Sequence, residues 1–179
     1  KFGFKSINTD LIAGLPGDNI KGFENSLQGI IALSPENITV HTLAIKRASK
    51  LCEQEGDIYG LGKQAVSMIN TAVCELNSNG YNPYYLYRQS KTVGGTENTG
   101  WSKKGHEGLY NVYIMDETHT ILACGAGAVT KLRQPDGHYI ERIFNYKFPY
   151  EYNNGLNELI KRKERVISFY EVPTPQKKS

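Results

Sequence analysis

NTDLIAGLPGDNIKGFENSLQGIIALSPENITVHTLAI, residues 8–45, is the stretch of sequence that decides the fold. It begins inside a predicted strand over residues 2–15, which Pro16-Gly17 ends. Residues 20–31 then carry apolar side chains at the spacing of an amphipathic helix, and β-branched residues dominate 37–45. A strand, a helix and a strand joined by short loops predict a βαβ unit with parallel strands and a right-handed crossover.

The same alternation continues up to about residue 89. Asp18 or Asn19 is the expected N-cap of the first helix. A longer helix is predicted over residues 61–76, where the apolar side chains share one face, and a third strand over residues 84–87. One βα unit after another predicts an α/β fold class for this part of the chain.

Beyond residue 90 the regular pattern ends. Residues 91–108 contain five glycines and no apolar periodicity, which predicts a long loop. Residues 111–115 and 120–123 are predicted to be two strands paired around a turn. The run Gln134-Pro135-Asp136-Gly137 predicts a second hairpin, because proline presets one turn position and glycine allows a positive φ.

Apolar residues between Leu156 and Tyr170 predict a C-terminal helix. We interpret the basic cluster at residues 161–165 as a solvated helix end that the helix dipole favours. Aromatic residues that could stack on a single strand are not interleaved with this cluster, so no nucleic-acid partner is expected. The tail, residues 173–179, is expected to be disordered.

The composition describes an ordinary globular chain of 179 residues, with 39% hydrophobic residues and a net charge of +3. Its longest apolar runs are too short to cross a membrane. Cys52, Cys74 and Cys124 lack the spacing of a zinc or cluster site, and the four histidines are scattered, so no metal site is expected. An odd number of cysteines without a signal peptide predicts reduced thiols in a cytoplasmic protein. The chain contains 12 tyrosines against 6 phenylalanines.

Chemistry in β/α folds gathers at the carboxyl ends of the strands. Asp10 lies near the first such end, where it could bind a ligand or brace the loop. Lys46 and Arg47 follow the second strand, where solvated surface charge is the alternative reading. Arg88 follows the tyrosine-rich third strand, and a guanidinium can bind a carboxylate and stack on an aromatic ring. Together these residues predict a basic, tyrosine-rich mouth for an anionic ligand.

The glycines of GAGAV, residues 125–129, would let a ligand approach the backbone closely. As a dinucleotide site this stretch is weak, because it follows a predicted hairpin rather than the first strand of a βαβ unit. Tight packing or a β-bulge is the alternative explanation.

Five strings of residues together resemble the oxygen-independent coproporphyrinogen III oxidases, and most closely the subgroup called coproporphyrinogen dehydrogenase. The resemblance runs from residue 8 to about residue 170. The strings are NTDLIAGLPG (8–17), LSPENITVHTLA (33–44), YYLYRQ (84–89), GHEGLYN (105–111) and ILACGAGAV (121–129).

This resemblance implies a radical S-adenosylmethionine enzyme that carries out the oxidative decarboxylation of coproporphyrinogen III to protoporphyrinogen IX in heme biosynthesis. It implies that residues 1–89 form the later strands of a partial (β/α)6 barrel. Residues 90–172 would then be a family-specific C-terminal α+β extension with hairpins and a terminal helix, and residues 173–179 the tail.

The resemblance also assigns residues. Asp10, Ala44 and Val129 match positions that contact S-adenosylmethionine in the family. A tetrapyrrole substrate with four carboxylates would give the predicted basic mouth a purpose, which makes candidate substrate contacts of Arg88, Lys46, Arg47, His106 and Tyr110.

The family's Cys-x3-Cys-x2-Cys motif, which holds its [4Fe–4S] cluster, does not occur in the chain. The chain also begins at Lys1 rather than at a methionine. We therefore expect a C-terminal part of a longer enzyme that is inactive without the preceding half of the barrel. Residues 2–15 would be an open sheet edge, through which the isolated chain is expected to dimerise.

A second reading comes from heme chaperones of the same superfamily, which carry an HNxxYW stretch before a similar glycine-rich strand. The equivalent residues here are HEGLYN (106–111), in which the histidine and the tyrosine are kept and two other positions differ. In a protein that carries heme or a porphyrin, His106 would be the candidate axial ligand.

Overall fold

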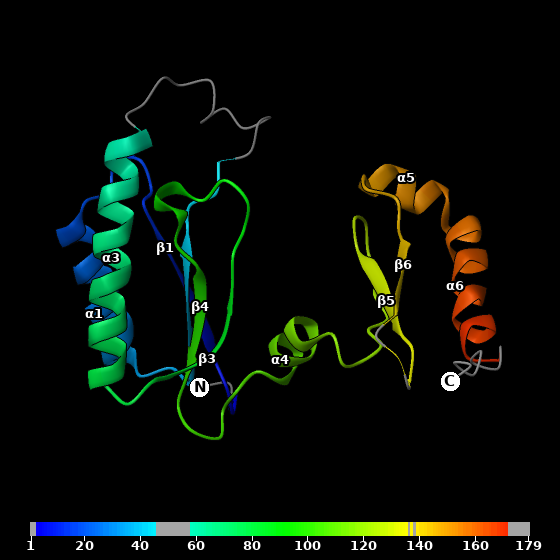
Figure 1. Ribbon diagram of the computed structural model, residues 1–179, viewed down its shortest axis with the longest axis horizontal. Coiled ribbons are helices and arrows are strands. Elements are labelled where there is room, and N and C mark those ends of the chain that lie inside the picture. Colours follow the sequence, from blue (N-terminus) through cyan, green and yellow to red (C-terminus); the bar gives the residue numbers. More distant parts are fainter. Residues whose placement is uncertain (1–2, 46–57, 136, 138, 172–179) are drawn as a thin grey trace, which may run out of the picture. The chain divides into compact units, whose positions relative to one another are not determined.

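The computed structural model describes residues 3–45, 58–135, 137 and 139–171, which divide into two compact units, residues 1–115 and 116–179 (Figure 1). The first unit contains a four-stranded sheet and the second a two-stranded hairpin with two helices. The elements of the first unit are β1 (Asn8–Ala13), α1 (Ile20–Leu33), β2 (Asn37–Thr42), α3 (Ile58–Ser78), β3 (Asn82–Tyr87), the 3-10 turn η1 (Val93–Gly95), β4 (Asn98–Ser102) and α4 (Leu109–Asp116). Those of the second are β5 (Val129–Arg133), β6 (Ile140–Phe144), α5 (Pro149–Asn154) and α6 (Leu156–Glu171).

The predicted βαβ unit is confirmed. β1 pairs in parallel with β2, from Asn8 opposite Asn37 to Ala13 opposite Thr42, and α1 connects them. Asn19 is the N-cap of α1, since its side chain accepts a hydrogen bond from the Gly22 N–H. The helix therefore begins where the sequence analysis expects it, with Asn19 rather than its neighbour in the capping position.

The predicted loop over residues 91–108 contains β4, so that prediction is wrong in its central part. The strand order is β1-β2-β4-β3, and β4 runs antiparallel to both of its neighbours. Its sequence, NTGWS, shows neither alternation nor β-branched character, and it contains Gly100. Gly100 pairs with Tyr85, whose ring occupies the space that a Cβ at residue 100 would fill. Gly100 lowers the strand signal of this sequence, and packing of the Tyr85 ring requires a glycine there.

Helices α1 and α3 cover one face of this sheet (Figure 1) and bury the core of the first unit. Burial of each large apolar side chain contributes about 1.5–3 kcal/mol to folding. Gly14 follows β1 with a positive φ of 83°, and a Cβ there would lie 2.9 Å from Val93 Cγ2. The core consists of Ala13, Phe23, Leu27, Ile38, Val40, Ala65, Met68, Ala72, Leu76, Tyr81, Val93 and Trp101.

Residues 111–115 lie in α4, which corrects the predicted strand pairing around residues 116–119. The Gly108 carbonyl accepts hydrogen bonds from the N–H groups of Asn111 and Val112, and these bonds start the helix. Aromatic and β-branched side chains favour a strand by propensity, but propensity yields to such local and tertiary contacts. Of residues 120–123, Ile121 forms one isolated bridge with Lys131.

The predicted second hairpin is confirmed as β5 and β6, with Val129 opposite Phe144 and Arg133 opposite Ile140. Residues 161–165 lie in the middle of α6 rather than at its end, so the dipole explanation of the basic cluster is wrong. Lys163 Nζ instead donates hydrogen bonds to Thr130 Oγ1 and the Ala123 carbonyl, at 2.6 and 3.2 Å. Arg165 pairs with both carboxylate oxygens of Glu141, at 2.7 and 2.8 Å. Lys163 and Arg165 of the cluster therefore link α6 to the hairpin of β5 and β6.

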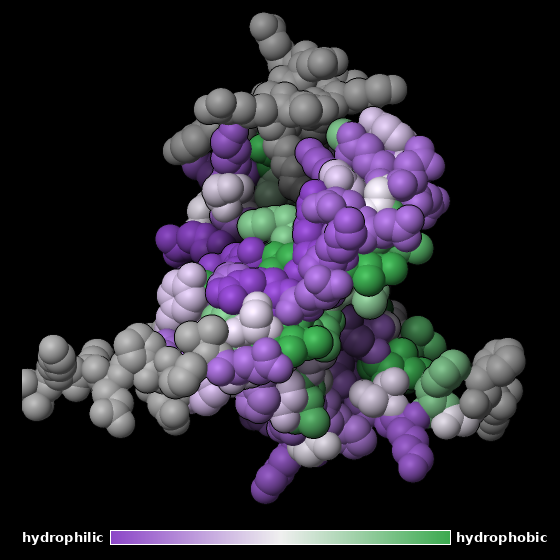
Figure 2. Space-filling model, turned by 90° about the vertical axis from the view of Figure 1, so that its right-hand side faces the viewer, coloured by the Kyte–Doolittle hydropathy of each residue, from purple (hydrophilic) through white to green (hydrophobic). Residues whose placement is uncertain are grey.

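The space-filling view in Figure 2 shows a face on which hydrophilic residues predominate and apolar residues form small groups. No helix among the described residues is long and apolar enough to cross a membrane. The boundary expected after residue 89 concerns the intact barrel and stays a prediction, whereas the compact units of this chain divide after Met115. The tail, residues 173–179, lies outside the described residues.

Candidate functional site

The sheet face opposite the two helices carries polar side chains and contributes to a pocket of about 310 Å³. Strands present alternate side chains to opposite faces. Ile38 and Val40 of β2 therefore face the helices, while Thr39 and His41 face the pocket. The pocket is lined by Asn8, Asp10, Thr39, His41, Tyr85, Tyr87, Tyr110, Asn111, Ile114 and Met115.

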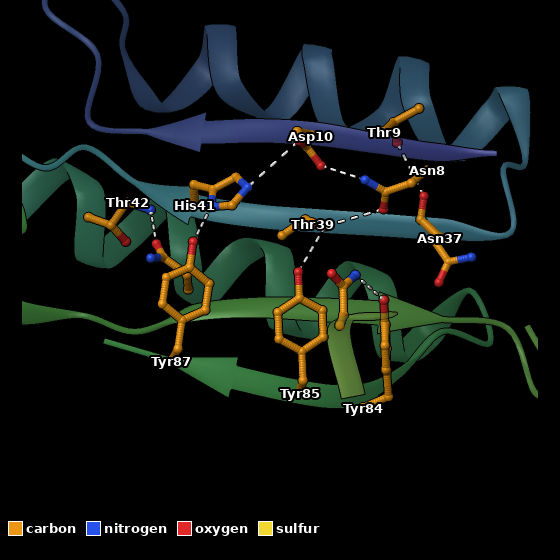
Figure 3. A network of polar contacts seen from close by, with 12 residues as sticks. Asn8, Thr9, Asp10, Asn37, Thr39, His41, Thr42, Tyr84, Tyr85 and Tyr87 are labelled. Carbon is orange, nitrogen blue, oxygen red and sulfur yellow. Dashed lines mark hydrogen bonds and ion pairs between the residues drawn. The ribbon is translucent and has the colours of Figure 1, made fainter. Parts of the chain in front are cut away.

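One chain of hydrogen bonds leads across the strands to Asp10 (Figure 3). Asn8 Nδ2 donates to Asp10 Oδ1 at 2.7 Å, and Thr39 Oγ1 donates to Asn8 Oδ1 at 3.2 Å. The Tyr85 hydroxyl lies 3.4 Å from Thr39 Oγ1 and is its donor, because the Thr39 proton is already used. Burial raises the pKa of the Tyr85 hydroxyl, which keeps that proton in place.

A second chain reaches the other oxygen of the same carboxylate. His41 Nε2 lies 3.8 Å from Asp10 Oδ2, and His41 Nδ1 lies 3.3 Å from the Tyr87 hydroxyl. The His41 side chain is 27% exposed and that of Asp10 is 57% exposed, so the carboxylate remains open to a ligand. Asp10 is thus the point at which both chains end.

Three tyrosines of β3 point their hydroxyls toward β2 (Figure 3). The rings of Tyr85 and Tyr87 stack with centroids 6.3 Å apart, and Tyr84 meets Tyr85 edge to face at 4.8 Å. A register shift between Pro83 and Tyr85 interrupts the pairing of β3 with β4 at Tyr84. The Tyr84 hydroxyl accepts a hydrogen bond from Asn111 Nδ2 at 3.0 Å, which links α4 to the sheet.

The electrostatic character of the pocket differs from that of the expected mouth. Among its lining residues the structure describes one carboxylate, one imidazole and three phenols, with no lysine or arginine. Arg88 is exposed and pairs with Glu97 at 3.4 Å, outside the lining. Lys46 and Arg47 lie outside the described residues. The described lining suits a positively charged ligand better than a carboxylate.

The other residues predicted from the sequence lie in several places. Asp10 and Tyr110 line the pocket together. Ala44 is half-buried and forms a backbone bridge with Thr92, just beyond the end of β2. Val129 begins β5 in the second unit.

The imidazole of His106 is exposed, in the loop between β4 and α4. Its main chain is held on both sides, because the carbonyl accepts a hydrogen bond from Asn37 Nδ2 at 2.8 Å and the N–H donates to the Lys103 carbonyl at 3.1 Å. The loop therefore has a fixed course while the ring of His106 stays accessible.

The sequence analysis did not single out Asn8, Thr39 or His41 as site residues. All three lie in the decisive stretch, and a signal was present there. Period-two alternation around Ile38 and Val40 places Thr39 and His41 on one face, and the parallel register then brings Asn8 beside them.

The described residues contain no group of three histidine, cysteine or acidic side chains that could hold a metal ion. These described residues therefore do not fit an iron–sulfur cluster, which needs at least three thiolates. They do fit part of S-adenosylmethionine, since a carboxylate acceptor and stacked aromatic rings lie in one pocket.

No family model matches the chain. It is 41% identical over 170 residues to the oxygen-independent coproporphyrinogen-III oxidase-like protein HemZ of Bacillus subtilis (strain 168), a match of 92% of this chain and 34% of that protein. It is 26% identical to the heme chaperone HemW of Bacillus subtilis, over 84% of this chain and 39% of that protein. It is 29% identical to the heme chaperone HemW of Haemophilus influenzae, over 86% of this chain and 36% of that protein.

Among solved structures, the fold is similar to that of a chain described as coproporphyrinogen III oxidase (HemN) from Escherichia coli, a radical SAM enzyme. The TM-score is 0.55 at 18% identity, over 87% of this chain and 35% of that one. The chain thus spans little more than a third of the length of the proteins that it matches. Over nearly its whole length it is homologous to the oxygen-independent coproporphyrinogen-III oxidase-like protein HemZ.

Proposed function

We propose that the intact protein containing this chain is a cytoplasmic radical S-adenosylmethionine enzyme that decarboxylates coproporphyrinogen III in heme biosynthesis. The observation that carries the proposal is the 41% identity to an oxidase-like protein over 92% of the chain. The fold similarity supports the barrel part of it, with residues 1–89 as the later portion of a partial (β/α)6 barrel. The [4Fe–4S] cluster would be held by residues outside this chain.

The residues of the pocket can bind and orient a cation. S-adenosylmethionine carries a positive sulfonium and an ammonium group, and Asp10 offers a carboxylate that accepts a hydrogen bond from Asn8 and lies within ion-pair distance of His41. The electron-rich faces of Tyr85 and Tyr87 can pack against the sulfonium or the adenine. The bound cofactor supplies the radical chemistry, while the protein supplies binding and orientation. In the same proposal the backbones of Ala44 and Val129 contact S-adenosylmethionine.

A substrate with four carboxylates needs cations that the described lining of the pocket lacks. We assign that role to Arg88, Lys46 and Arg47, which follow β2 and β3 in the sequence. Glu97, the partner of Arg88, would have to release the guanidinium, and an exposed pair of this kind holds by less than about 1 kcal/mol. His106 and Tyr110 remain candidate contacts to the tetrapyrrole.

Heme carriage is the second candidate function. The similarity to two heme chaperones and the exposed ring of His106 support it, but their identity to this chain is lower than that of the oxidase-like protein. Hemin titration separates the two functions. A Soret shift that is seen in the wild type and lost in His106→Ala would favour a heme carrier. The same shift in the wild type and in His106→Ala would show that His106 is not a heme ligand.

The experiment that tests the proposed enzyme uses the intact protein, prepared without oxygen and with its cluster assembled. Formation of protoporphyrinogen and binding of S-adenosylmethionine are measured for the wild type and for Asp10→Asn, with Glu24→Gln as control. Glu24 is an acidic residue of α1 that does not line the pocket to which Asp10 belongs. We expect Asp10→Asn to weaken cofactor binding and Glu24→Gln to leave it unchanged. Absence of decarboxylation in the wild type would refute the proposed reaction.

A further inference from the structure

His41 is the one histidine in the described lining of the pocket. Phenols ordinarily titrate near pH 10 and carboxyls near pH 4, whereas a histidine changes charge between about pH 5 and 8. The other titratable groups that line the described pocket are Asp10 from β1, Tyr85 and Tyr87 from β3, and Tyr110 from α4. The described lining contains no lysine or arginine that would compete with His41 for Asp10, and no glutamate that would compete with Asp10 for His41.

The two oxygens of Asp10 are held in different ways. Oδ1 accepts from the amide of Asn8, whose charge does not depend on pH. Oδ2 lies 3.8 Å from His41 Nε2, which is too long for a hydrogen bond but within the range of an ion pair. Asp10 is opposite Thr39 in the register, and His41 is two residues further along β2, so the two side chains are diagonal neighbours on one face.

Tyr87 contacts the other ring nitrogen of His41, since its hydroxyl lies 3.3 Å from Nδ1. When the phenol is the donor in this contact, the ring proton of neutral His41 is on Nε2 and faces the carboxylate. A neutral ring leaves the negative charge of Asp10 available, whereas a protonated ring neutralises that charge.

We propose that His41 is a positioning residue that makes cation binding at Asp10 dependent on pH. Neutral His41 holds the carboxylate ready for a positively charged ligand, and protonated His41 pairs with the carboxylate in the ligand's place. This inference rests on the proposed function in one respect, namely that the ligand at Asp10 is the cationic S-adenosylmethionine.

The first experiment needs no ligand. The chain is labelled with ¹⁵N-histidine, and the ring nitrogen shifts at pH 8 report which nitrogen carries the proton. We expect His41 in the Nε2–H form, and a mixture of both forms in Tyr87→Phe and in Asp10→Ala. His106, which makes neither contact, serves as the internal control. A proton on Nδ1, or shifts that neither substitution changes, would overturn the positioning role.

The second experiment measures binding of S-adenosylmethionine to the intact protein between pH 5.5 and 8. His41→Gln keeps a neutral donor at the position of Nε2, so it preserves the contact with Asp10 but cannot take up a proton. Titration of the ligand's own amino group affects both proteins equally. We expect the wild type to lose about 1.4- to fivefold more affinity at pH 5.5 than His41→Gln does, since an exposed ion pair contributes about 0.2–1 kcal/mol.

The neutral-sulfur analogue S-adenosylhomocysteine should show a smaller difference between the two proteins. Identical pH profiles for S-adenosylmethionine would overturn the proposal. If neither protein binds S-adenosylmethionine at pH 8, the proposed function fails, and the ring nitrogen shifts still decide whether His41 orients Asp10.

Discussion

Replacing Gly100 with alanine tests how the fold and the candidate site depend on one another. The Tyr85 ring occupies the space where a Cβ at residue 100 would lie, and the two residues are paired across β4 and β3. The added methyl group must displace the ring, since β4 is held on both sides by its neighbours. Inserting a methyl group into packed structure usually costs about 1–3 kcal/mol, and we expect Gly100→Ala to lower the free energy of unfolding by this amount.

A double-mutant cycle isolates the contact. In a Tyr85→Ala background the ring is gone, so adding Gly100→Ala should cost less than about 0.5 kcal/mol. Gly29→Ala is the matched control, because Gly29 lies within α1 with no atom near its missing Cβ. A helix gains from that change, so Gly29→Ala should stabilise the first unit by up to about 1 kcal/mol.

The assay is urea unfolding followed by tryptophan fluorescence. Trp101 is the single tryptophan of the chain and is 3% exposed in the core of the first unit, so its signal reports on that unit alone. Equal costs of Gly100→Ala with and without the Tyr85 ring would refute the reasoning. A loss of stability in Gly29→Ala as large as in Gly100→Ala would do the same.

Three further predictions follow from single contacts. Asn19→Ala should lower the free energy of unfolding of the first unit by about 1 kcal/mol, because the Gly22 N–H loses its acceptor. If Asn19→Ala and the wild type unfold at the same urea concentration, Asn19 does not stabilise α1 as a cap. Lys131 and Arg142 lower the pKa of Glu117, so its contribution is present above the ordinary carboxyl range and is lost as pH falls through the lowered value. Circular dichroism between pH 7 and 2 should therefore show a flatter loss of stability in Glu117→Gln than in the wild type. The outer edge of β1 has no partner strand among the described residues, so we expect the isolated chain to dimerise through it, and a monomeric mass by light scattering at high concentration would count against this.

The sequence is sufficient to predict those elements whose apolar residues follow one period. The βαβ unit and the long helix α3 are examples, whereas the hairpin of β5 and β6 was predicted from the turn residues 134–137. β4 could not be predicted in this way, because Gly100 and Trp101 serve contacts with Tyr85 and with the core rather than a regular alternation. The helix α4 was missed for a related reason: its aromatic residues favour a strand until the contacts of its first turn are known.

Of the site residues, some could be predicted from the local sequence, whereas others depend on contacts between distant parts of the chain. Asp10 could be identified because a carboxylate near the end of an apolar strand requires a partner. The partners themselves depend on the parallel register, which places Thr39 opposite Asp10 and His41 one diagonal step away. Arg88 was predicted to face a ligand, but its distance to Glu97 could not be known before β4 was placed beside β3.

The excess of tyrosine over phenylalanine acquires a physical meaning in this pocket. Phenylalanine at positions 85 and 87 would keep the stacked rings and the packing against Gly100, so packing alone does not require tyrosine there. The Tyr85 hydroxyl lies at the start of the chain of hydrogen bonds that ends on Asp10 Oδ1, and the Tyr87 hydroxyl contacts His41, whose Nε2 lies 3.8 Å from Asp10 Oδ2. Donors in such chains strengthen one another, and each keeps the next group in a single orientation. One carboxylate held from both sides, in a described lining without lysine or arginine, is an arrangement that favours a cation. Under the proposed function, the tyrosine pocket would bind the positively charged cofactor, and the cations that follow β2 and β3 in the sequence would bind the anionic substrate.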